Sequence, residues 1–308
     1  MKVAYMFSGQ GAQCAGMGRE LYDQFPACRA IFDEASQRLG FSMPQLCFTE
    51  NDRLNLTEFT QPAILTMSMA CLQLLKDCAP PAYLLGLSLG EYTALTASGA
   101  FAFGDAVALV RKRGRFMTEA VPAGEGAMTA LMGVTRAEAD EICAAAAGAG
   151  IVVPANYNMP GQVVIAGQLA AVQKAEEAAR ERGVKKTIRL QVSGPFHTKL
   201  LQPAAELLRE ELLRTTIGEM MIPVVSNLTA REIPNGRDAV VDTLTRQVMS
   251  PTLWEDSIRY LIEQGFDTFV ELGPGKTLCS FVKKIDKEVL TLNIEDVKSC
   301  EAAREALG

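Results

Sequence analysis

Short apolar runs alternate with longer amphipathic segments over most of this chain, and Gly and Pro residues separate them. Residues 28–39 place four apolar side chains on one helical face, and Gly40 follows as a stop signal. For the main part of the chain the pattern predicts strands over residues 2–7, 82–85, 222–226 and 266–272, and helices over residues 28–39, 58–78, 89–98, 105–120, 198–214, 239–249 and 253–264. This alternation indicates an α/β fold in which helices cover both faces of a parallel sheet.

A different order of elements is predicted in the middle of the chain. Thr135 and Glu138 form a capping-box pattern at the start of one helix, which Ala-rich sequence continues to near Gly148. Strands are predicted over residues 127–132, 151–153, 162–166 and 185–192, and a second helix over residues 169–182. With the first helix they give the order β-α-β-β-α-β, which is that of a ferredoxin-like unit. We therefore expect a ferredoxin-like subdomain over residues 126–192, inserted into a larger body formed by residues 1–125 and 193–308.

The composition is that of an ordinary folded protein. Of the 308 residues, 48% are hydrophobic and 21% are charged, which supplies a sizeable core and disfavours disorder. A net charge of −6 argues against a nucleic-acid-binding protein, and polar side chains interrupt the apolar residues 64–75, which are too few to span a membrane. The eight cysteines contain no C-x-x-C pair, which favours a reducing compartment. We expect a monomer in the cytoplasm, with neither nucleic acid nor membrane as a partner.

Residues 86–90, Gly-Leu-Ser-Leu-Gly, fit the pattern G-x-S-x-G between a predicted strand and a predicted helix. In this context the pattern is typical of a nucleophile elbow, in which a sharp turn exposes the serine hydroxyl at the end of the sheet. Ser88 is then the candidate nucleophile, and the backbone N–H of Leu89 is available for an oxyanion hole. The five-residue pattern G-x-S-x-G also occurs by chance in Gly-rich chains. The prediction of a nucleophile elbow therefore depends on the predicted strand before the pattern and the predicted helix after it.

His197 is the only histidine in the chain. A serine hydroxyl is a weak nucleophile until a base takes its proton, and no second imidazole exists for that task or for a His-rich metal site. A lone histidine is more often structural, but this one lies in a loop where the predicted insert rejoins the body, a natural cleft wall. No metal is expected.

No acidic residue is an obvious partner to orient His197, and a backbone or amide carbonyl could do so instead. Because the base must be neutral, we expect acylation to fall as the pH drops through the ordinary imidazole pKa of about 6.5.

Four basic residues crowd positions 111–115, with Gly114 among them. Such a run is usually a solvated helix face. However, a glycine inside a helix costs about 1 kcal/mol relative to alanine, which suggests a close approach at this point. If Arg113 turns inward there, its guanidinium can bind a carboxylate with two hydrogen bonds and so select an acyl group that carries a free acid.

Six motifs now occur in an order that resembles one known family. They are residues 7–11 (FSGQG), 86–92 (GLSLGEY), 113–117 (RGRFM), 162–167 (QVVIAG), 194–197 (GPFH) and 269–275 (FVELGPG). Together they are similar to the malonyl-CoA:acyl carrier protein transacylases over nearly the whole chain. The resemblance implies an α/β-hydrolase-like body with a ferredoxin-like insert. It also implies a ping-pong transfer of a malonyl group from malonyl-CoA to the phosphopantetheine thiol of acyl carrier protein, without a further cofactor.

The resemblance also implies roles for individual residues. Ser88 is the nucleophile, His197 its base, and the backbone N–H groups of Gln10 and Leu89 form the oxyanion hole. Arg113 binds the malonyl carboxylate.

Four further residues receive roles from the same resemblance. The main-chain carbonyl of Gln247 orients the histidine, Gln61 lies near the acyl pocket, and Asn158 lines the insert side of the cleft. Phe196 resembles the pattern of members that prefer malonyl over methylmalonyl groups.

Two positions depart from the family pattern: Leu87 replaces a frequent histidine, and Ser8 replaces a frequent proline. Neither change removes a catalytic atom. A serine esterase or thioesterase, a non-catalytic carrier-binding module, and a trans-acting acyltransferase of a polyketide synthase remain alternatives. Since acyl carrier proteins are acidic, a basic patch is needed for docking. Its candidates are Lys185, Lys186, Arg189 and Lys199, although a solvated charge run explains them equally well.

Overall fold

The central sheet of the body contains five parallel strands in the order β7-β2-β1-β8-β9. These strands are β1 (Val3–Phe7), β2 (Tyr83–Gly86), β7 (Val224–Val225), β8 (Thr268–Leu272) and β9 (Leu290–Ile294). The structure is a computed structural model that describes residues 1–78, 80–122, 124–192 and 194–308. The parallel sheet predicted from the alternation of elements is confirmed.

Helices cover both faces of this sheet, so its central strand is buried on both sides. In β1, Val3, Tyr5 and Phe7 pack into one apolar cluster, and Ala4 and Met6 pack into another. The helices of the body are α1 (Arg19–Gln24), α2 (Pro26–Leu39), α3 (Met43–Phe48), α4 (Thr57–Gln73), α5 (Leu89–Ala97), α6 (Phe103–Glu119), α9 (Gln202–Arg214), α10 (Arg237–Gln247), α11 (Trp254–Glu263), α12 (Thr277–Ile285) and α13 (Val297–Leu307). Helices α11 and α12 pack on the second cluster, and α2, α4 and α5 pack on the first.

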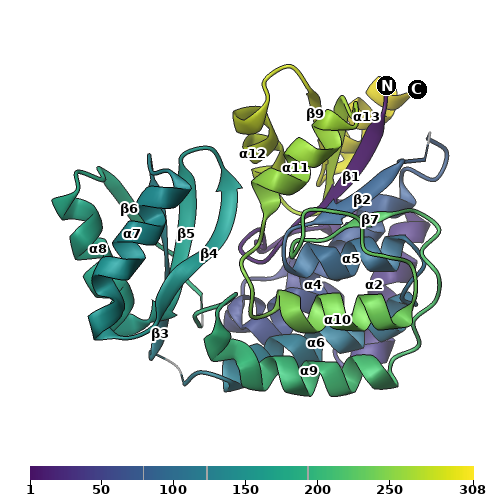
Figure 1. Ribbon diagram of the computed structural model, residues 1–308. Helices are drawn as coiled ribbons and strands as arrows, with labels where there is room; N and C mark the ends of the chain where they lie inside the picture. The colour runs from purple at the N-terminus through teal and green to yellow at the C-terminus, as the bar shows by residue number, and fades with distance from the viewer. Residues whose placement is uncertain (79, 123, 193) are drawn as a thin grey trace.

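A second, antiparallel sheet lies beside the body and has the order β4-β5-β3-β6 (Figure 1). Its elements are β3 (Gly126–Met132), α7 (Arg136–Ala146), β4 (Val152–Met159), β5 (Gln162–Gln168), α8 (Leu169–Glu181) and β6 (Lys186–Arg189). The predicted order β-α-β-β-α-β and the Thr135 capping box are both observed. The elements fall within the predicted range 126–192, but the predicted boundary at Ser193 lies outside the described residues.

The two faces of the antiparallel sheet have different neighbours. Leu131 and Ile165 pack into the small core beneath α7 and α8. Met128 and Val164, on the opposite face, belong to the large apolar cluster that the insert shares with the body. The insert therefore covers one side of the body, which is how a cavity forms between them.

Several boundaries differ from the sequence-based expectation. The helix predicted over residues 58–78 ends at Gln73, and β6 ends at Arg189 instead of residue 192. Strand β4 extends to Met159, well beyond the predicted residue 153, because Asn156 and Asn158 break the apolar pattern and the strand is irregular there. Helices α1, α3, α12 and α13 and strand β9 were not predicted. None of the described helices has the length and apolar character needed to cross a membrane.

Gly114 lies at the point where α6 crosses α4. A Cβ atom at this position would lie 2.5 Å from the carbonyl oxygen of Thr57 and 2.9 Å from the Cα of Glu58. A backbone neighbour cannot move aside as a flexible side chain can, so only glycine allows this approach. The close approach predicted from the sequence is thus confirmed, and it brings the adjacent Arg113 into the interior.

We predict that Gly114→Ala lowers the free energy of unfolding by about 1–3 kcal/mol, because the added methyl group forces α6 away from α4. Gly104→Ala, in the same helix, is the matched control. A Cβ there first meets the carboxylate of the exposed Glu34 side chain at 3.4 Å, so the change is neutral or slightly stabilising. Urea unfolding of both variants measures the difference, and equal stabilities would contradict the packing argument.

Candidate active site

Ser88 lies in the turn between β2 and α5, at the carboxyl end of the parallel sheet. Its backbone has φ 54° and ψ −98°, a conformation that non-glycine residues rarely adopt. The flanking glycines are required sterically. A Cβ at Gly86 would lie 2.0 Å from backbone atoms of Gly90, and a Cβ at Gly90 would lie 2.1 Å from the carbonyl oxygen of Phe7. The strand-turn-helix context predicted for G-x-S-x-G is therefore confirmed.

The side chain of Asn227 stabilises this turn, and the sequence analysis did not identify that residue. Its Oδ1 accepts a hydrogen bond of 2.6 Å from the backbone N–H of Ser88. Its Nδ2 donates to the carbonyl of Gly86 over 2.7 Å. One amide thus bridges the two sides of the strained turn and stabilises its shape.

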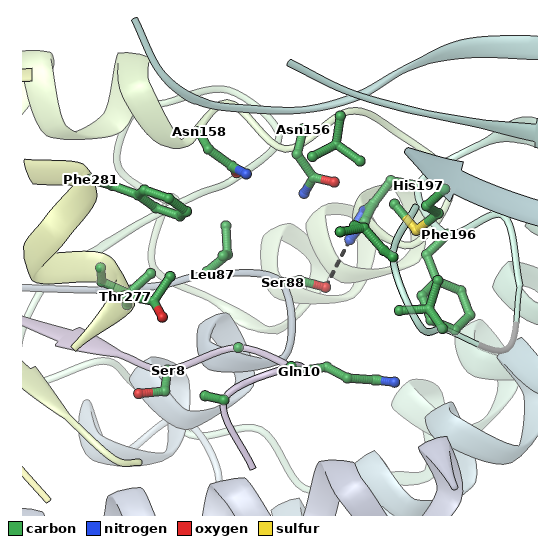
Figure 2. A pocket seen from close by; sticks show the side chains of 18 of the residues that line it. Ser8, Gln10, Leu87, Ser88, Asn156, Asn158, Phe196, His197, Thr277 and Phe281 are labelled. Atoms are coloured by element: carbon green, nitrogen blue, oxygen red, sulfur yellow. Dashed lines mark hydrogen bonds between the residues drawn. The ribbon is translucent and has the colours of Figure 1, made fainter. Parts of the chain in front are cut away.

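His197 reaches Ser88 from the loop before α9. Its Nε2 lies 2.8 Å from the Ser88 Oγ, as Figure 2 shows by a dashed line. Its Nδ1 lies 3.0 Å from the carbonyl oxygen of Gln247 and 3.1 Å from that of Ser250. Because carbonyl oxygens only accept, Nδ1 carries the proton, and Nε2 is left with a lone pair that faces the hydroxyl.

The orientation of His197 therefore comes from two backbone carbonyls. The Gln247 carbonyl was expected, whereas Ser250 was missed, since a carbonyl carries no residue-specific signal in the sequence.

Burial lowers the pKa of His197 to about 4, and the positive charge of Arg113 adds to this effect. The hydrogen bonds to the two carbonyls oppose the shift but do not cancel it. The expectation of an ordinary imidazole pKa near 6.5 is therefore wrong, because that value assumes a solvated ring. The imidazole is neutral throughout the neutral pH range.

Arg113 is the buried member of the basic run, with an exposed fraction of 1%. Its Nη1 donates to Gln61 Oε1 over 2.9 Å, and its Nη2 donates to Gln247 Oε1 over 3.1 Å and to Ser88 Oγ over 3.2 Å. The ring of Tyr92 lies 5.0 Å from the guanidinium carbon. These partners are all neutral groups, so a desolvated cation lies directly beside the serine hydroxyl.

A cavity of about 230 Å³ opens above Ser88, between the body and the insert. In Figure 2, Asn156 and Asn158 reach into it from the insert, and Phe281 and Thr277 reach into it from α12. Its wall also includes the side chains of Met117, Met128, Val164, Leu190, Val192 and Phe196. A mostly apolar cavity with a few convergent polar groups is typical of a small-molecule site.

The structure brings most of the predicted site residues together. Gln10, Phe196 and Asn158 line the cavity, and Leu89 begins α5, where a first-turn N–H has no helical acceptor. Gln61 and Gln247 are not among the described residues that line the cavity, because both are buried behind Arg113.

The two departures from the family pattern, Leu87 and Ser8, also line the cavity. The single O–H of Ser8 has two acceptors within hydrogen-bond distance, Glu271 Oε1 at 3.4 Å and the Pro274 carbonyl oxygen at 3.3 Å. Burial raises the pKa of Glu271 to about 7, and its Oε2 accepts the backbone N–H of Cys279 in the first turn of α12. This carboxylate holds α12 against the cavity. The sequence analysis did not identify Glu271 as a site residue, although it lies in the motif at residues 269–275.

Comparison with known proteins agrees with this geometry. Residues 4–304 match the acyl transferase domain family. The malonyl CoA-acyl carrier protein transacylase of Bacillus subtilis strain 168 is 44% identical over 309 residues, which cover 99% of this chain and 97% of the relative. The chain belongs to the acyl transferase domain family. It is an acyltransferase, and the resemblance seen in its six motifs is confirmed.

Solved structures of related proteins have the same fold as this acyltransferase. The malonyl CoA-acyl carrier protein transacylase from Clostridium perfringens Atcc 13124 has a TM-score of 0.95 and 46% identity, with 100% of this chain and 97% of that chain covered. A malonyl-transacylase in complex with a type II PKS acyl-carrier protein has a TM-score of 0.96 and 36% identity, with 99% and 100% covered.

We predict that the single imidazole of this acyltransferase titrates near pH 4, which NMR can measure without ambiguity because the chain has one histidine. The Cε1–H shift is followed against pH, with circular dichroism recorded at each point to establish that the protein is folded. Arg113→Gln should raise the midpoint, because it removes a nearby positive charge. A midpoint near 6.5 in the folded protein, or no change in the variant, would contradict this account.

Proposed function

We propose that this acyltransferase moves a malonyl group from malonyl-CoA to the phosphopantetheine thiol of acyl carrier protein, through a malonyl-Ser88 intermediate. The observation that carries the proposal is the buried Arg113, whose Nη2 lies 3.2 Å from the Ser88 hydroxyl. The names of the relatives support the same substrates.

In the first half-reaction, Ser88 Oγ attacks the thioester carbonyl of malonyl-CoA while His197 Nε2 takes the hydroxyl proton. The tetrahedral oxyanion is stabilised by the backbone N–H groups of Gln10 and Leu89. Collapse of this intermediate breaks the carbon–sulfur bond, and His197 gives its proton to the departing sulfur, so that CoA leaves as the thiol and the imidazole is neutral again. Because the pKa of His197 is low, its imidazole is unprotonated at neutral pH and can accept the proton.

In the second half-reaction, the carrier thiol enters the site that CoA has left. His197 Nε2 takes the thiol proton, the thiolate attacks the malonyl-Ser88 ester, and the same N–H groups stabilise the oxyanion. Ser88 then leaves and recovers its proton from the imidazole. The proposed steps need only the protein and its two substrates, and no cofactor takes part.

Arg113 supplies the acyl selectivity in this proposal. The short distance between its Nη2 and the Ser88 Oγ suits an acid whose carboxylate is one methylene away from the reacting carbonyl. A carboxylate there replaces neutral partners with a charge-assisted pair beside a buried guanidinium. Phe196 in the cavity wall leaves less room for a methyl branch, which favours malonyl over methylmalonyl groups.

Acyl carrier protein is the proposed partner, as it is of the related transacylase solved in a complex. Lys185, Lys186 and Lys199 remain the proposed docking residues, because they flank the segment that contributes Leu190, Val192 and His197 to the cavity. Arg189 is a weaker candidate, since its guanidinium already pairs with Glu176 over 2.8 Å.

For the fold, we propose an α/β-hydrolase-like body over residues 1–125 and 193–308 and a ferredoxin-like insert over residues 126–192. The serine turn between β2 and α5 supports the first comparison. The order β-α-β-β-α-β supports the second.

Incubation with malonyl-CoA, followed by intact-mass measurement, should give one malonyl adduct that Ser88→Ala abolishes. Arg113→Ala should slow malonyl adduct formation roughly 10- to 100-fold, because hydrogen bonds to charged groups contribute about 1.5–3 kcal/mol. The same variant should gain relative activity toward acetyl-CoA. Arg115→Ala, an exposed arginine two residues away, is the matched control and should behave as the wild type.

Three results would contradict the proposal. They are the absence of an adduct, an adduct that survives Ser88→Ala, and full malonyl transfer by Arg113→Ala. An adduct that water removes faster than holo-acyl carrier protein does would instead identify a thioesterase.

A further inference from the structure

A buried carboxylate lies behind the serine turn and has no role in the steps above. Glu91 is in the first turn of α5, three residues after Ser88, and its exposed fraction is 0%. A buried acidic side chain is rare unless its oxygens are hydrogen-bonded. Its contacts therefore indicate what it does.

Glu91 Oε2 accepts two hydrogen bonds, one from the backbone N–H of Asn227 over 3.0 Å and one from Gln247 Nε2 over 3.1 Å. Both donors belong to residues that contact the catalytic groups directly. Asn227 bridges the Ser88 turn, and Gln247 contacts Arg113 through its side chain and His197 through its carbonyl. One oxygen of Glu91 is thus shared by the supports of all three catalytic side chains.

These contacts fix which end of the Gln247 amide faces Arg113. Its Nε2 is surrounded by acceptors, since it also donates to the backbone carbonyl of Ser88 over 2.8 Å. Its Oε1 is consequently the end that faces Arg113 Nη2. In the flipped amide, oxygen would face the Glu91 carboxylate, and the NH₂ group would face a guanidinium that can only donate.

We propose that Glu91 is a positioning residue, which acts through Gln247 and Asn227 to hold Arg113 and the Ser88 turn in the arrangement that accepts a malonyl group. The inference rests on the proposed function and deepens it. His197 is oriented by carbonyls, so the site has no triad carboxylate. Glu91 instead orders the amides around the reacting groups.

The role requires an acceptor oxygen at this point and does not require a negative charge. Burial raises the pKa of Glu91 to about 7, against the opposing effect of its hydrogen bonds and of Arg113. A protonated carboxyl retains an acceptor oxygen, and so does a glutamine amide. Geometry and charge can therefore be separated by substitution.

The test measures the ratio of Ser88 acylation rates with malonyl-CoA and with acetyl-CoA, because a ratio does not depend on the fraction of folded enzyme. Glu91→Gln keeps the acceptor and should keep the ratio within about threefold of the wild type. Glu91→Leu removes the acceptor and should lower the ratio about tenfold or more. Glu91→Asp keeps the charge but withdraws the oxygen by one methylene, and should lower the ratio about fivefold.

Leu95→Ala is the control for stability, since Leu95 is buried in the same helix and belongs to the apolar cluster. It should lower the Tm and leave the ratio unchanged. If Glu91→Leu does not fold, Glu91→Asp decides alone. A wild-type ratio in Glu91→Asp or Glu91→Leu, or a loss in Glu91→Gln equal to that in Glu91→Leu, overturns the inference. A wild-type enzyme that forms no malonyl adduct overturns the proposed function instead.

Discussion

The burial of one positive charge, that of Arg113, organises this active site. The hydrogen-bond partners of the desolvated guanidinium are neutral groups, among them the amide oxygens of Gln61 and Gln247. Its charge contributes to the low pKa of His197, so the imidazole is unprotonated at neutral pH. Gly114 makes the burial possible, because a larger residue would separate α6 from α4. We propose that the same charge selects the acyl group.

Two strained residues face each other at the centre of the site. Ser88 and His197 both have positive φ values, 54° and 61°, which side-chain-bearing residues adopt only when their surroundings fix them. Ser88 is fixed by the Asn227 amide and by the flanking glycines. His197 is fixed by two carbonyls and by the serine itself. These contacts hold the Ser88 hydroxyl and the His197 imidazole at hydrogen-bond distance.

Local patterns predicted the parts of the site that depend on one segment of chain. The serine turn, the single histidine and the inward arginine all followed from residue types at short spacing. The supports did not, because Ser250 acts through a carbonyl, which any residue has, and Asn227 lies 139 positions from the serine that it holds. Strand β4 was underestimated for a related reason. Its polar residues face a cavity instead of solvent, and they interrupt the apolar alternation that marks a strand.

We propose that the buried Arg113 receives the carboxylate of the acyl group beside Ser88. A crystal structure of the malonyl-enzyme, trapped by soaking with malonyl-CoA in the absence of carrier protein, tests it most directly. We predict density for a malonyl ester on Ser88 Oγ, with both carboxylate oxygens within hydrogen-bond distance of the Arg113 guanidinium and the Arg113–Ser88 contact replaced. A malonyl ester whose carboxylate points into the open cavity, with Arg113 still bonded only to the neutral groups, would contradict it.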